Sequence, residues 1–191
     1  MSREPDGFAA FAAGYRERYL DAFARWDIAA LAPIAAMLRS ARLRGARVLI
    51  AGNGGSAAIA NHAECDGSKT ADRPDQPALD VRSLSANPSM LTAIANDLGY
   101  AAVFERQVAY FGRPGDVLIL VSSGGRSPNM IEACHAARSR GLVVVAFVGF
   151  DGGELKQLAD HVFHVPVDDY GIVEDLHQAS FHVLARFLRD H

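Results

Sequence analysis

Two short loops rich in glycine and serine have the composition best suited to chemistry in this chain. Residues 52–56 read Gly-Asn-Gly-Gly-Ser and follow an apolar run, and residues 122–127 read Ser-Ser-Gly-Gly-Arg-Ser after another. Glycine lets the backbone approach a ligand closely, and a helix N-terminus beyond such a loop favours phosphate. One such loop is often just a tight turn. Two in one chain predict an anion site, although neither loop is a Walker A motif.

A second group of candidates consists of histidines and carboxylates at helical spacing. His62 and Asp66 are four residues apart on a predicted helix over 57–69, so they share one face. That spacing suits two metal ligands or an acid–base pair, and it is also common on helix surfaces with neither role. In the predicted last helix, Glu174 and His182 are eight residues apart, about 12 Å along the axis. They can serve one ion only by leaning together, and otherwise they serve separate sites across a subunit interface.

Uninterrupted apolar runs predict the scaffold that must position these side chains. Helical stretches separate the predicted strands, which cover 48–51, 77–85, 117–121, 142–148 and 160–165. Apolar strands alternating with helices are typical of a parallel sheet covered on both faces. We therefore expect an α/β three-layer sandwich with a central parallel sheet of about five strands. Ligands bind such sheets beyond the carboxyl ends of the strands, where both loops would lie.

The N-terminal residues are predicted to form helices that precede this sheet. Aromatic residues recur there at spacings of three and four, and Asp27 and Gly45 are suited to begin and end a second helix. We predict that residues 1–45 form a helical segment of the same domain as residues 46–191. So many aromatic residues exceed what one small sheet needs to cover, which indicates an oligomer interface.

Composition excludes several classes of protein. The chain has 191 residues, enough for one domain, and its net charge of −3 shows no basic excess for binding nucleic acid or a membrane surface. Two cysteines exclude a disulfide scaffold and a four-cysteine zinc site, and they fit a reducing cytoplasm. We expect no membrane span and, given the polar start MSREPDGF, no signal peptide.

Four motifs in a fixed order give the chain a family resemblance. They are GNGGS at 52–56, ANDLGY at 95–100, RPGDVL at 113–118 and FDGG at 150–153. The chain resembles the phosphoheptose isomerases of the SIS-domain (sugar isomerase) family over nearly its whole length. The resemblance implies a homotetramer whose active sites are shared between subunits, with one zinc ion per subunit. It also implies conversion of sedoheptulose 7-phosphate to D-glycero-D-manno-heptose 7-phosphate, for the activated heptose of lipopolysaccharide or capsule.

The resemblance also assigns roles by position. It implies that the phosphate is held by the serines Ser56, Ser122, Ser123 and Ser127. It implies that the remaining substrate contacts come from Asn53, Gly54, Asp97 and Arg126. The family usually has asparagine where this chain has Arg126, which could bind phosphate through charge-assisted hydrogen bonds or point into solvent. The metal would be surrounded by His62, Asp66, Glu174 and His182.

Aldose–ketose isomerisation needs a base beside a carbonyl and an acid or metal that stabilises the enediol oxygens. The family usually has glutamate where this chain has Asp66 and glutamine where it has Glu174, so either carboxylate could be the base. We favour Asp66 because its helix begins at the phosphate loop, with His182 as the acid.

The alternative function is a non-catalytic SIS-domain binding protein. It would be an adaptor that associates with the replication initiator, or a sugar-phosphate sensor. An adaptor has no need for two histidines and two carboxylates together, which favours the enzyme.

Overall fold

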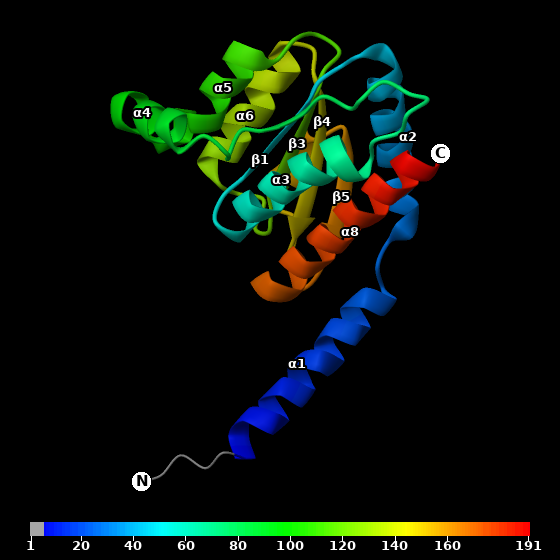
Figure 1. The fold of residues 1–191 in the computed structure, drawn as a ribbon. Coiled ribbons are helices and arrows are strands. Elements are labelled where there is room, and N and C mark those ends of the chain that lie inside the picture. The colour runs from blue at the N-terminus through cyan, green and yellow to red at the C-terminus, as the bar shows by residue number, and fades with distance from the viewer. Residues whose placement is uncertain (1–5) are drawn as a thin grey trace.

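A parallel sheet of five strands in the order β2-β1-β3-β4-β5 forms the centre of the molecule (Figure 1). The computed structural model describes residues 6–191, so residues 1–5 of the predicted helical segment lie outside it. The strands are β1 (Val48–Gly52), β2 (Val81–Ser83), β3 (Val117–Ser122), β4 (Val143–Gly149) and β5 (His161–Val165). The predicted α/β fold with about five parallel strands is confirmed, although only three residues of the expected strand over 77–85 pair with the sheet.

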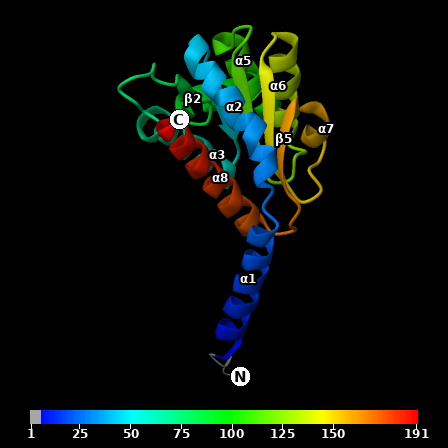
Figure 2. The same ribbon diagram turned by 90° about the vertical axis from the view of Figure 1, so that its right-hand side faces the viewer.

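Helices cover both faces of the sheet (Figures 1 and 2). On one face lie α2 (Ile28–Arg44), α3 (Gly55–Cys65) and α8 (Tyr170–Asp190). The other face carries α4 (Pro88–Leu98), α5 (Val103–Phe111), α6 (Pro128–Ser139) and α7 (Leu155–Leu158). Side chains alternate along a strand, so Val48 and Ile50 enter the first core while Leu49 and Ala51 enter the second. Two apolar cores thus hold three layers together.

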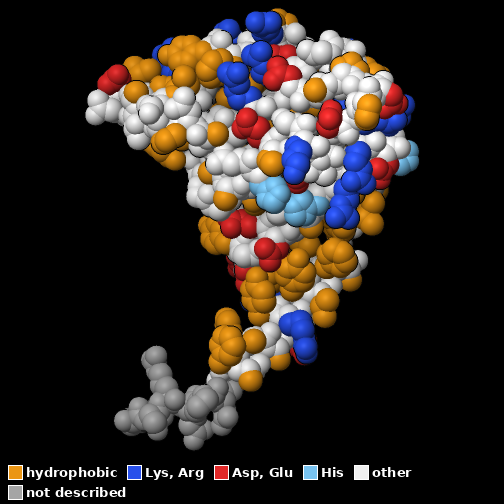
Figure 3. Space-filling model, viewed as in Figure 1, with side chains coloured by type: hydrophobic (Ala, Val, Ile, Leu, Met, Phe, Trp, Pro, Cys, Tyr) orange, Lys and Arg blue, Asp and Glu red, His pale blue; other side chains and the backbone are white. Residues whose placement is uncertain are grey.

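The helix α1 (Asp6–Ala24) projects away from this body (Figures 1 and 2). Several of its large apolar side chains are exposed, among them Phe8 (77%) and Phe11 (71%). Figure 3 shows hydrophobic side chains along the projecting helix. Within the described residues, none of the helices combines the length and apolar character that crossing a bilayer requires.

The stretch 57–69, predicted as one α-helix, contains a change of helix type. The α-helix α3 ends at Cys65, and a π-helical turn, η1 (Asp66–Thr70), follows it. Its backbone bond joins the amide of Ala71 to the carbonyl oxygen of Asp66, 2.8 Å apart. Gly67 permits a close approach to strand β2, because a Cβ there would lie 2.6 Å from a methyl carbon of Val81. Single π-turns of this kind occur frequently at functional sites.

Candidate active site

The chain leaves β1 toward β2 on one side, whereas β3 lies on the other side of β1. Such a switch in strand order opens a crevice at the carboxyl ends of the strands. A cavity of about 490 Å³ lies there, lined by Asn53, Ser56, Val121, Ser122, Ser123, Gly124, Arg126, Ser127, Phe150, Tyr170 and Glu174. We name it the switch-point cavity. The structure therefore brings the two predicted loops together.

The switch-point cavity offers unpaired hydrogen-bond donors to a ligand. Helix α3 begins after Gly54 and helix α6 after Ser127, and neither capping residue makes a side-chain cap hydrogen bond. The first amides of each helix are thus left without side-chain caps. The hydroxyl of Ser123 is buried and has no hydrogen-bond partner among the described residues. Because an unpaired buried hydroxyl is costly, this lining fits an anion that accepts hydrogen bonds.

Glycine is required where the serine loop meets the FDGG loop. Gly125 has a φ of 62°, and a Cβ on it would lie 2.1 Å from the carbonyl oxygen of Gly152. The amide of Leu155 donates to the carbonyl oxygen of Gly125 at 3.0 Å. The two loops thus pack backbone against backbone, which links motifs that are about 25 residues apart in the sequence.

Polar pairs fix the residues around this cavity. Asn53 and Asn129 exchange two amide hydrogen bonds of 3.0 Å, and the hydroxyl of Tyr100 donates to Asn53 at 2.9 Å. Arg126 donates to both carboxylate oxygens of Asp151, which holds the pKa of that carboxyl well below its usual range. Arg126 is thus one of the residues that line the cavity, and its guanidinium is paired with Asp151.

Two aromatic residues of the cavity were missed by the sequence analysis. The rings of Phe150 and Tyr170 pack with centroids 4.7 Å apart, and both line the cavity. Phe150 has a positive φ of 49°, a rare conformation for a bulky residue. The position of Phe150 at the start of the FDGG motif could have predicted a place in the site, whereas no sequence pattern predicts one for Tyr170.

Three of the four predicted metal ligands meet in one group. Nε2 of His62 lies 3.5 Å from Oδ2 of Asp66, and Nε2 of His182 lies 3.7 Å from the same oxygen. One ligand atom from each residue lies within 4.8 Å of the others. We call these three residues the His–Asp cluster. The hydroxyl of Thr70, in the same π-turn as Asp66, donates to Oδ1 of Asp66 at 2.9 Å.

The donor set of the His–Asp cluster fits a divalent metal. The side-chain amide nitrogen of Gln178 lies 2.9 Å from Nε2 of His182, so a metal bound to this nitrogen would take the place of that contact. Two imidazoles, one carboxylate and an open position are what zinc has in catalytic sites. A second cavity of about 230 Å³, lined by Asp66, Thr70, His182 and Arg186, adjoins the cluster.

Two predicted site residues lie apart from that group. Glu174 lines the switch-point cavity, with its carboxylate packed so closely on Gly55 that a Cβ there would be 2.2 Å from Oε2. Burial, and to a smaller degree the nearby Asp175, raises the pKa of Glu174. Asp97 is exposed on α4 and is not among the residues that line the cavity. The assignments of Glu174 to the metal and of Asp97 to the substrate stay predictions.

Comparison with known proteins agrees with this geometry. The family model of the SIS domain matches residues 13–149. A phosphoheptose isomerase of Maridesulfovibrio salexigens is 39% identical over 149 residues, which cover 77% of this chain and 71% of that protein. One of Rhodospirillum rubrum is 37% identical over 163 residues, which cover 84% and 85%.

Solved structures agree as well. A phosphoheptose isomerase from Neisseria gonorrhoeae superposes with a TM-score of 0.87 at 30% identity and covers 97% of this chain and 98% of its own. A Vibrio vulnificus NanR protein complexed with ManNAc-6P is 16% identical and shares the fold alone. The chain belongs to the phosphoheptose isomerase family of SIS-domain proteins.

Proposed function

We propose that this protein isomerises sedoheptulose 7-phosphate to D-glycero-D-manno-heptose 7-phosphate through an enediol. The observation that carries the proposal is that one helix joins the two parts of the site. Helix α3 begins at the switch-point cavity, and Asp66 follows its last residue. Ser56 and Asp66 are ten residues apart, about 15 Å along a helix. A heptose 7-phosphate likewise carries its phosphate at C7 and reacts at C1 and C2, the opposite end of the molecule.

The phosphate binds in the switch-point cavity, where the serine hydroxyls and the two helix N-termini donate hydrogen bonds to it. Binding at this end positions the reacting carbons and lowers the entropic part of the barrier. Asn53 contacts the sugar. Arg126 either leaves Asp151 and binds the substrate, or stays paired with Asp151 beside the cavity. Asp97 completes the substrate contacts.

Asp66 is the base that takes a proton from C1 and returns it to C2, while the hydroxyl proton of O1 passes to O2 with His182 as the acid. Glu174 is the second carboxylate, and whichever of Asp66 and Glu174 is free of a bound metal would act as the base. His62, Asp66 and His182 would hold one zinc ion per subunit, with Glu174 as the fourth predicted ligand. When bound, zinc would act as a Lewis acid toward the substrate oxygens.

The protein assembles as a homotetramer in the cytoplasm and supplies heptose for activated-heptose biosynthesis. Exposed apolar side chains on α1 support assembly with further copies of the chain. Sedimentation at micromolar concentration should give a tetramer. Phe8→Ser combined with Phe11→Ser should shift it toward smaller species, and a monomeric wild-type protein would contradict the assembly.

The activity is tested by incubating the zinc-loaded protein with sedoheptulose 7-phosphate in D₂O and following the aldose by proton NMR. An enediol route incorporates solvent deuterium at C2 of the product. Asp66→Asn serves as the control for contaminating isomerases. No conversion by the wild-type protein, with zinc and without it, would refute the proposed function.

A further inference from the structure

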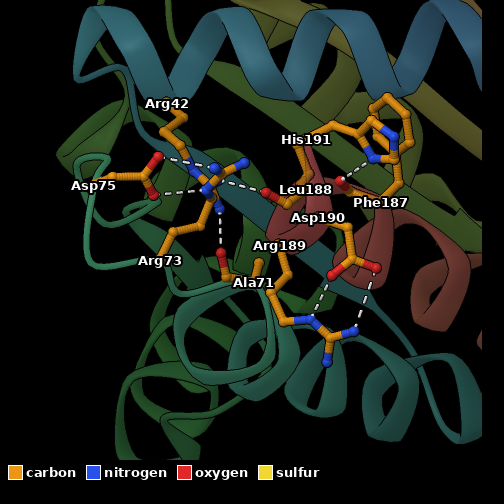
Figure 4. A network of polar contacts seen from close by, with 9 residues as sticks. All are labelled: Arg42, Ala71, Arg73, Asp75, Phe187, Leu188, Arg189, Asp190 and His191. Atoms are coloured by element: carbon orange, nitrogen blue, oxygen red, sulfur yellow. Dashed lines mark hydrogen bonds and ion pairs between the residues drawn. The ribbon is translucent and has the colours of Figure 1, made fainter.

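Arg42 of helix α2 is a buried cation whose guanidinium is hydrogen-bonded to backbone carbonyl groups, while the carboxylates of Asp72 and Asp75 act on it only from a longer distance. The residue is 1% exposed, and within the described residues no carboxylate oxygen lies within 4.0 Å of its guanidinium. Nη1 donates to the carbonyl oxygen of Leu188 at 2.7 Å, and Nη2 donates to that of Ala71 at 2.5 Å (Figure 4). The Gln76 side chain accepts a longer bond of 3.4 Å. The two Nη groups of the buried guanidinium are thus paired, whereas its Nε has no hydrogen-bond partner among the described residues.

Both main acceptors lie at the C-terminal ends of helical segments. Leu188 is in the last turn of α8, and Ala71 is the capping residue of the π-turn Asp66–Thr70. Carbonyl groups at such ends lack intrahelical donors and carry the negative end of the helix dipole. One planar guanidinium therefore joins the ends of two segments that are far apart in the sequence (Figure 4).

The same two segments carry the His–Asp cluster. The amide of Ala71 donates to the carbonyl oxygen of Asp66 at 2.8 Å, while the carbonyl oxygen of Ala71 accepts from Arg42. On α8, Leu188 follows His182 by six residues, about 9 Å along the helix. The contact between Asp66 and His182, 3.7 Å, therefore depends on how η1 and α8 are held relative to each other.

We propose that Arg42 is a positioning residue for the His–Asp cluster. Its guanidinium fixes the end of the π-turn against the end of α8, so that the Asp66 carboxylate and the His182 imidazole keep the separation they need. Lysine cannot replace it fully, because an ammonium group lacks the planar fork that reaches two carbonyls at once. The expected effects of Arg42 on metal binding and catalysis rest on the proposed function, whereas its expected effect on hydrogen exchange does not.

The test compares Arg42→Met and Arg42→Lys with a control, Val144→Ala. Val144 is fully buried in the core on the opposite face of the sheet, so its truncation lowers stability without touching η1 or α8. Three quantities are measured on the full chain: hydrogen exchange of peptides covering 66–72 and 184–190, the affinity for Zn²⁺ alone, and kcat and KM.

We expect Arg42→Met to speed exchange in both peptides. It should weaken zinc binding and lower kcat by about 10-fold each, the lower end of what supporting residues around metal sites contribute. KM should change less than twofold because the switch-point cavity is untouched. Arg42→Lys should fall between Arg42→Met and the wild type, and Val144→Ala should match the wild type in exchange at both peptides, zinc affinity and kcat.

The inference is overturned if Arg42→Met lowers the melting temperature yet keeps the zinc affinity and kcat of the control. If Arg42→Met does not fold, Arg42→Lys decides by the same readouts. A wild-type protein that neither binds zinc nor isomerises the sugar refutes the proposed function instead. In that case exchange still decides, because unchanged protection of residues 66–72 in the variants overturns the role of Arg42.

Discussion

The switch-point cavity and the His–Asp cluster differ in the structural elements and in the chemical groups that form them. The cavity is formed mainly by the loops at the carboxyl ends of β1 and β3, with Tyr170 and Glu174 added by α8. Apart from Arg126, its donors are neutral: backbone amides, hydroxyl groups and the Asn53 amide. The cluster is formed by ionisable side chains on α3, η1 and α8, and its geometry depends on how these helical segments pack. Sheet pairing fixes the first site, and helix packing fixes the second.

This difference indicates that substrate binding belongs mainly to the cavity and acid–base chemistry mainly to the cluster. A ligand anchored by many neutral donors loses little when one is removed, because each contributes a modest free energy. Acid–base chemistry depends on one group at one position, so its loss is severe. Substitutions in the cavity should therefore act mainly on KM, and substitutions in the cluster mainly on kcat.

The largest effect is expected from Asp66→Asn, which keeps the shape of the side chain and removes its basicity. We expect kcat to fall by about 10²- to 10⁴-fold, the usual contribution of a general base. KM should stay within a few-fold of the wild type. Steady-state kinetics check this, and a kcat that falls less than 10-fold would transfer the role of base to Glu174.

His62→Ala should remove a metal ligand while leaving the switch-point cavity unchanged. We expect zinc affinity to fall by at least the 10- to 100-fold that even supporting residues contribute. Titration against a chromophoric chelator measures the affinity, with Ser123→Ala as the matched control that keeps it. Equal zinc affinity in His62→Ala and the control would show that the cluster does not bind the metal.

Ser123→Ala and Ser127→Ala should weaken phosphate binding without a comparable loss of kcat. Each removes one neutral hydrogen bond worth roughly 0.5–1.5 kcal/mol, so KM should rise by about 2- to 10-fold. The inhibition constant of inorganic phosphate should rise by the same factor. If phosphate inhibition is unchanged in both variants, the anion binds elsewhere.

The smallest effect is expected from Glu174→Gln, as a dependence of stability on pH. Burial raises the pKa of Glu174 in the folded state, so its ionised form is penalised above its ordinary pKa of about 4.3. The stabilisation by the protonated form is present below that value and is lost as the pH rises through the folded pKa. Glutamine removes the penalty, so the variant should melt at a higher temperature than the wild type at pH 7.

This advantage of Glu174→Gln should vanish as the pH falls below about 4, where the wild-type carboxyl is also neutral. Differential scanning calorimetry across this range measures the difference. A variant that melts lower than the wild type at pH 7 would contradict the prediction. It would show that the carboxylate is stabilised by contacts with α3, and that it is not penalised by burial.

The sequence by itself determined the sheet, the two loops and their common location. Apolar runs such as 117–121 are long and uninterrupted, and a strand buried on both faces admits little else, so pattern and structure agree. The loops follow these strands directly, and parallel pairing alone then brings their ends to one edge. His62 and Asp66 are similarly local, because four residues of helix place them on one face.

Only the tertiary structure decided which distant side chains join them. Asp66 and His182 are 116 residues apart and meet because α3 and α8 pack side by side on one face of the sheet. The same packing places Glu174 at the switch-point cavity, since eight residues of helix separate it from His182. Spacing along a helix fixes a distance along its axis. The partner that faces each turn depends on the crossing of two helices, which no local pattern encodes.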